Sequence, residues 1–143
     1  VCADNDVSAH MAKVIDAVKN NGLRLFLCED GNCFEKEVIY SISWNAFCAL
    51  TQCEEIGFPC QHIRIAEDLK NRISLATSTQ EQDKIREEIL QKAIKDSKEW
   101  FKHIPGGEFL GSIVLDDIEN IPNDNNLKKN IVELINWCGF GKD

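Results

Sequence analysis

Apolar side chains recur every three or four residues along most of the chain, which is the spacing of amphipathic helices. Glycine, proline and short polar stretches separate these periodic segments, where helices are expected to end. The pattern predicts helices over 6–20, 34–56, 61–76, 80–103, 109–118 and 127–138. We therefore expect an all-α protein of five to six helices that forms a single compact domain over residues 1–143.

The segment 34–56 has the widest apolar stripe and is predicted to be one long central helix. Val38, Ile42 and Leu50 lie on one side of it, and Trp44 and Phe47 widen the stripe. A helix with so broad an apolar face is expected to be covered by neighbours on several sides.

Local signals mark some of the other boundaries. Ser78 followed by Glu81 is the pattern of a capping box, which predicts the start of a helix near residue 80. The stretch "IPGGEF" at 104–109 is expected to be a turn that ends that helix. In 23–34 the Asp30-Gly31 pair allows a short hairpin, and an irregular loop fits equally well.

Composition places the chain among ordinary globular proteins. Its 143 residues are 43% hydrophobic and 28% charged, values typical of a folded domain. No apolar run approaches the roughly 20 residues needed to span a bilayer, so membrane insertion is not expected. The sequence begins Val1-Cys2, and the simplest account is a mature secreted protein whose leader has been removed.

The net charge is −8, from 24 acidic and 16 basic side chains. Such a surface repels the phosphates of nucleic acids and anionic membranes, so neither is an expected partner. It favours a basic protein or a cationic small molecule.

Seven cysteines, five of them within 28–60, indicate an extracellular protein stabilised by disulfides. We expect about three bridges and one cysteine left over, although the sequence does not determine the pairing. The remaining cysteine is either a buried thiol, as expected for Cys48, or a bridge between two chains, for which Cys138 is the example. The disulfide candidates are Cys2, Cys28, Cys33, Cys48, Cys53, Cys60 and Cys138.

Zinc is the alternative use of these thiols. Two Cys-x4-Cys units, 28/33 and 48/53, are separated by 14 residues, a layout that resembles a four-thiolate site. Cys48 and Cys53 lie on one predicted helix, however, about 140° apart around its axis. They cannot bind one ion together while the helix continues, so we expect no metal.

Catalytic motifs are absent from the sequence. Cys60 and His62 are close along the chain, but a cysteine in a disulfide-rich protein is expected to be structural. We therefore predict a protein that is not an enzyme and needs no cofactor. The densest acidic group, Asp116, Asp117 and Glu119, lacks the spacing of a calcium loop and is expected to be a solvated face. An acidic contact surface is the functional alternative. Its members are Glu108, Asp116, Asp117 and Glu119.

Three tryptophans, Trp44, Trp100 and Trp137, lie on the apolar stripes of different predicted helices. The simpler interpretation is that they meet in the core. The functional alternative is that they line an interhelical pocket for a small hydrophobic ligand.

Small, acidic, helical and disulfide-rich chains with a processed leader are found among secreted arthropod proteins. The 25-residue gap between Cys2 and Cys28 fits insect odorant-binding proteins, but the four residues between Cys28 and Cys33 depart from the three that this family has. The chain resembles more closely the small salivary proteins of blood-feeding mosquitoes. This resemblance is one of type, over the whole chain.

The resemblance implies a secreted, non-enzymatic protein that binds a host protein and thereby modulates immune cells or haemostasis. The alternative function is that of a carrier for a small apolar or amine ligand. For a protein contact, the exposed faces of the 80–103 helix and the acidic segment 108–125 are the expected surfaces.

Overall fold

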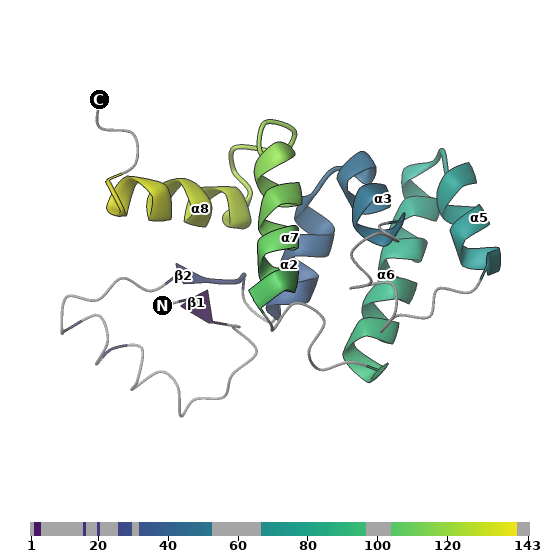
Figure 1. Ribbon diagram of the computed structural model, residues 1–143, viewed down its shortest axis with the longest axis horizontal. Coiled ribbons are helices and arrows are strands. Elements are labelled where there is room, and N and C mark those ends of the chain that lie inside the picture. Colours follow the sequence, from purple (N-terminus) through teal and green to yellow (C-terminus); the bar gives the residue numbers. More distant parts are fainter. Residues whose placement is uncertain are drawn as a thin grey trace. The chain divides into compact units, whose positions relative to one another are not determined.

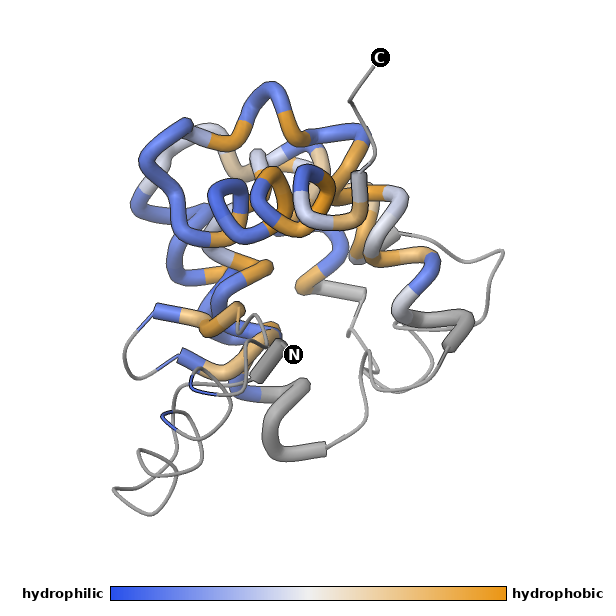
Figure 2. Tube along the Cα trace, turned by 90° about the vertical axis from the view of Figure 1, so that its left-hand side faces the viewer, coloured by the Kyte–Doolittle hydropathy of each residue, from blue (hydrophilic) through white to orange (hydrophobic). Residues whose placement is uncertain are grey.

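The computed structural model describes residues 2–3, 16, 20, 26–29, 32–52, 67–96 and 104–139. Six helices and two very short strands occur within these ranges, which confirms the all-α class (Figure 1). The elements are β1 (Cys2–Ala3), β2 (Phe26–Leu27), α2 (Phe34–Ser41), α3 (Trp44–Gln52), α5 (Glu67–Leu75), α6 (Thr79–Asp96), α7 (Ile104–Asp116) and α8 (Asn126–Trp137). Hydrophobic and hydrophilic residues are interspersed along each helix, as the colours of Figure 2 show.

The chain divides into two compact units. The first consists of Val1–Ser41 together with Pro122–Asp143, and the second is the continuous stretch Ile42–Ile121. The first unit therefore joins two segments that are far apart in the sequence, and the second is formed by the residues between them.

In the first unit, α2 packs against α8, and β1 pairs with β2 in parallel. Cys2 lies opposite Phe26 and Ala3 opposite Leu27. Within the described residues, β2 therefore pairs with a strand near the start of the chain and not in a hairpin. The turn signals used for the hairpin are local and carry no information about so distant a partner.

In the second unit, α3 packs against α5 and α7, and α5 packs against α6. An exposed ion pair also joins α5 to α6, with Nη1 of Arg72 at 2.9 Å from Oε2 of Glu88. The deepest core residues are large apolar side chains contributed by all four helices. They include Phe47, Leu50, Leu69, Ile73, Ile85, Ile89, Leu90, Leu110 and Val114.

The single helix predicted over 34–56 is wrong, because the described part of this segment forms two helices, α2 and α3. The break falls at Ile42 and Ser43. The amide of Ser43 donates to Oδ2 of Asp117 instead of continuing the helix, and Oγ of Ser43 accepts from the amide of Ala46 at 3.2 Å. Ser43 therefore caps α3, held in place by a carboxylate from the far end of α7.

The stretch "IPGGEF" is helical, contrary to the predicted turn. It forms the beginning of α7, which starts at Ile104 and ends at Asp116. Proline is tolerated in a first helical turn, because an amide there has no carbonyl partner within the helix. The signal that was read as a helix end therefore marks a helix start.

Other predicted boundaries are confirmed within a few residues. Oγ of Ser78 accepts from the amide of Glu81 at 3.3 Å and donates to its Oε2 at 2.9 Å, at the start of α6. The last predicted helix corresponds to α8, capped by Asn125, and 61–76 contains α5. The predicted helix 6–20 lies outside the described residues except for Asp16 and Asn20.

Candidate functional site

Helix α8 exposes more apolar surface than an amphipathic helix needs to expose. Leu127 is its only buried residue among those described, and Ile131 and Leu134 are half-buried. Three large apolar side chains are exposed instead: Val132 by 46%, Ile135 by 38% and Trp137 by 61%. Exposed tryptophan is uncommon on a protein surface that has no partner.

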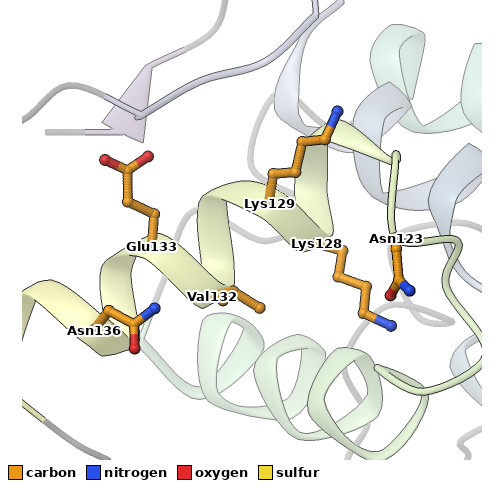
Figure 3. Close-up of a pocket in the computed structure, with 6 residues that line it drawn as sticks. All are labelled: Asn123, Lys128, Lys129, Val132, Glu133 and Asn136. Carbon is orange, nitrogen blue, oxygen red and sulfur yellow. The ribbon is translucent and has the colours of Figure 1, made fainter.

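A hollow with a volume of about 350 Å³ lies beside this helix (Figure 3). Its size falls within the range of small-molecule pockets. Figure 3 shows that Lys129 and Glu133 extend to one side of the helix and Lys128 to another, so the charged groups do not converge on one point. The hollow is lined by Asn123, Lys128, Lys129, Val132, Glu133 and Asn136. It is therefore an open surface feature formed by one helix and the preceding loop.

Two asparagines attach α8 to the rest of its unit. Nδ2 of Asn126 donates to the carbonyl of Leu27 at 2.9 Å and to Oε1 of Glu37 at 2.7 Å. Nδ2 of Asn130, one turn later, donates to the same carbonyl of Leu27 at 2.8 Å. Both asparagines point toward the unit because residues four apart share a helix face.

Glu37 is the centre of this network and is only 5% exposed. Its second oxygen, Oε2, accepts from the amide of Glu29 at 3.1 Å and from Nδ2 of Asn32 at 3.0 Å. The carboxylate thus receives three hydrogen bonds from neutral donors, and it joins α2, the 29–32 segment and α8. We call Glu37, Asn126, Asn130 and the Leu27 carbonyl the α8 anchor.

Asp117 forms a second buried network, in the other unit. Its Oδ1 accepts from Oγ of Ser43 at 2.6 Å and from Nδ2 of Asn120 at 2.9 Å, and its Oδ2 accepts from the Ser43 amide. Burial alone raises the pKa of Asp117, but the Ser43 and Asn120 hydrogen bonds and the charge of Arg86 outweigh it, so the pKa lies below its ordinary value.

The predicted acidic surface is therefore wrong for Asp117, which is only 6% exposed and works as a helix cap. The reason is the position of Ser43, a partner 74 residues earlier in the chain. Glu108, Asp116 and Glu119 are exposed as predicted. Whether they form a contact surface stays a prediction.

Arg86 is buried against the two aromatic rings at the start of α3. Its guanidinium carbon lies 5.6 Å from the centre of the Trp44 ring and 4.9 Å from that of Phe47, and Nη2 donates to the carbonyl of Ile42 at 2.9 Å. The two rings stack on each other with centres 5.0 Å apart. This cluster fixes the start of α3, because Arg86 binds the last carbonyl before the cap.

The three tryptophans do not share one environment. Trp44 is half-buried under Arg86, and Trp137 is 61% exposed, so the prediction that they meet in the core is wrong for Trp137. Trp100 lies outside the described residues. Trp44 and Trp137 belong to different units, and a shared pocket stays a prediction.

The cysteines are described only in part. Cys28 is buried, Cys33 and Cys48 are half-buried and Cys138 is exposed. The thiols of Cys48 and Cys138 are free. Cys53 and Cys60 lie outside the described residues, and only the backbone of Cys2 is described, in β1. The predicted bridges therefore stay a prediction.

Neither a metal-binding cluster nor a membrane-spanning helix is present in the described part of the chain. No group of three or more histidine, cysteine or acidic side chains has the arrangement of a metal site there. None of the helices, over the residues described, combines the length and apolar character that a bilayer span requires.

Sequence reasoning did not single out Glu37, Asn126, Asn130 or Arg86. Asn126 and Asn130 do carry a signal, since two asparagines four residues apart beside the apolar stripe of a helix suggest inward-facing polar groups. The sequence does not identify the groups that accept their hydrogen bonds, because Leu27 is 99 residues away from Asn126.

Comparisons with known proteins identify no relatives for this chain. It matches no protein family, no curated protein and no solved structure.

Proposed function

We propose that the protein is secreted and acts without catalysis, by binding another protein through a surface that includes α8. The exposure of Val132, Ile135 and Trp137 on one short helix is the observation that carries this proposal. Tryptophan is over-represented among the residues that dominate the free energy of protein binding. Aromatic side chains are enriched at the centre of such contacts, so Trp137 is the residue expected to contribute most.

Secretion and the nature of the partner rest on the sequence. Seven cysteines in 143 residues support an extracellular location. The resemblance to salivary proteins of blood-feeding mosquitoes supports a host protein as the partner, with immune cells or haemostasis as the affected process. The carrier alternative has less support, because the side chains around the α8 hollow do not converge on a ligand.

The test is a binding screen against purified extracellular proteins. The chain is immobilised, and receptor ectodomains, cytokines and coagulation factors are passed over it one at a time. For a protein that binds, Trp137→Ala is expected to weaken the affinity at least about tenfold, since a buried aromatic anchor is lost. Leu115→Ala is the matched control, because Leu115 is an apolar side chain that is 52% exposed on α7.

Two results would overturn the proposal. One is a partner whose affinity falls with Leu115→Ala but is unchanged by Trp137→Ala. The other is a screen without any binder, combined with native mass spectrometry that finds a small molecule retained by the purified chain. That second result supports the carrier function.

A further inference from the structure

We propose that the α8 anchor is a latch, and that α8 detaches from its unit while the second unit stays folded. This inference deepens the proposed function, because it describes how the α8 surface is regulated. The latch itself does not depend on that function. Its basis is the shared hydrogen-bond network at Glu37 together with the shallow burial of most apolar side chains of α8.

The burial of apolar side chains on α8 is deepest at its first turn. Leu127, in the first turn, is 7% exposed, whereas Ile131 and Leu134 further along are only half-buried. Segments with few buried apolar contacts open locally more readily than segments inside a core. By comparison, α6 contributes Ile85, Ile89 and Leu90, each no more than 2% exposed, to the second unit.

Three hydrogen bonds from the first half of α8 hold this end of the helix to its unit. Asn126 and Asn130 provide the three hydrogen bonds from α8 to Leu27 and Glu37, and both belong to the first half of α8. The bond to the Glu37 carboxylate is 2.7 Å long, the shortest of the three. Hydrogen bonds to an ionised group are stronger than neutral ones, particularly in a buried setting.

Glu37 is suited to control the latch, because its carboxylate accepts hydrogen bonds both from α8 and from the rest of the first unit. Its Oε1 faces α8 through Asn126, and its Oε2 faces Glu29 and Asn32. Replacing one carboxylate oxygen by an amide NH2 would remove an acceptor on one side of Glu37 and place donor against donor there, which destabilises the closed arrangement. Opening would then be favoured, since water satisfies the asparagine of a released α8.

Detachment would change the surface that α8 offers. Leu127, Ile131 and Leu134 are spaced four and three residues apart and lie on one face of the helix. In the closed state they face the unit, and Ile135 lies at the edge of the same stripe. A released α8 would present this whole stripe, the form in which amphipathic helices enter apolar grooves. A partner that binds the open helix would shift the equilibrium toward it.

The experiment is amide hydrogen exchange on the full chain, followed by mass spectrometry of its peptides, with no ligand added. In the unmodified protein, α8 amides are expected to exchange at least about tenfold faster than those of α6. Glu37→Gln is expected to accelerate exchange in α8 at least about tenfold further and to leave α6 unchanged. Glu108→Gln is the matched control, since it makes the same chemical change at an exposed carboxylate of α7.

A second variant covers the case in which Glu37→Gln does not fold. Asn130→Ala removes one hydrogen bond to Leu27 and leaves the Glu37 network intact, so a smaller acceleration confined to α8 is expected. The inference is overturned if α8 and α6 exchange at the same rate in the unmodified protein. It is also overturned if either variant accelerates α6 as much as α8, because that pattern indicates global unfolding.

This readout separates the latch from the proposed function. A mobile α8 with no protein partner in the binding screen would overturn the proposed function and keep the latch. A partner whose binding depends on Trp137, together with α8 amides that exchange no faster than those of α6, would overturn the latch and keep the proposed function.

Discussion

Asp117 illustrates how much one buried carboxylate can organise. It is 6% exposed and accepts hydrogen bonds from the backbone and hydroxyl of Ser43 and from the amide of Asn120. These bonds fix the first turn of α3 relative to the end of α7. Sequence analysis predicted Asp117 to be a surface group because acidic neighbours surround it, and no local pattern distinguishes it from Asp116.

The lowered pKa of Asp117 predicts acid sensitivity. A carboxyl whose folded pKa lies below its unfolded value stabilises the fold above the unfolded value, here 3.8, and loses that contribution as the pH falls through the folded pKa. Asp117→Asn should lower the free energy of unfolding at pH 7 by about 1–3 kcal/mol, and by less at a pH below the folded pKa. Urea denaturation at both pH values measures this difference. Asp116→Asn is the control, and an equal loss in both variants would contradict the assignment.

Cys48 and Cys138 should differ in reactivity. Burial raises the pKa of Cys48, and the charge of Arg86 offsets this only in part, so the thiol stays protonated near neutral pH. Cys138 is exposed. With iodoacetamide at pH 7.5, we expect Cys138 to be alkylated at least about tenfold faster, as read by timed peptide mass spectrometry. The two thiols are expected to react at equal rates only in denaturant. Equal alkylation rates in the folded protein would contradict the environment described for Cys48.

At the scale of elements, local signals located most helices, although the turn signal at 104–109 was wrong because that stretch begins α7. The caps at Ser78 and Asn125 determine where α6 and α8 begin, and hydrophobic periodicity locates α5. The break at Ser43 and the pairing of β1 with β2 depend on residues far away in the sequence, which no local pattern identifies. Periodicity also predicts an apolar face on α8 without showing that Val132, Ile135 and Trp137 remain uncovered.

Gly111 offers a test of helix α7. A Cβ atom at this position would meet no heavy atom within 4 Å, and its backbone has no positive φ. Glycine inside a helix is about 0.5–1 kcal/mol less favourable than alanine, so Gly111→Ala should stabilise the protein by about that amount. Thermal or urea denaturation measures this gain.

Gly139 provides the opposite control. It follows α8 with a φ of +80°, a conformation that side-chain-bearing residues rarely adopt. Gly139→Ala is therefore expected to destabilise the end of α8, although its Cβ would also meet open space. If Gly111→Ala destabilised the protein as well, the open surroundings of Gly111 would be wrong.

At the scale of the whole molecule, the free thiols bear on how many disulfides the protein can form. The sequence predicts about three bridges among seven cysteines. If Cys48 and Cys138 keep the free thiols that the structure gives them, five cysteines remain and at most two bridges can form. Intact mass without reducing agent distinguishes these cases. Four hydrogens below the reduced mass with three alkylated thiols supports two bridges, and six hydrogens with one alkylated thiol supports three.

The division into two units has a consequence for the order of folding during synthesis. The second unit, Ile42–Ile121, is one continuous stretch and is synthesised before residues 122–143, which the first unit also needs. The first unit needs contacts between residues 99 and 103 positions apart, such as those from Asn126 and Asn130 to Leu27. Because domains fold as their residues emerge, the contacts of α8 with α2 and Leu27 are expected to form last, after the second unit has been synthesised.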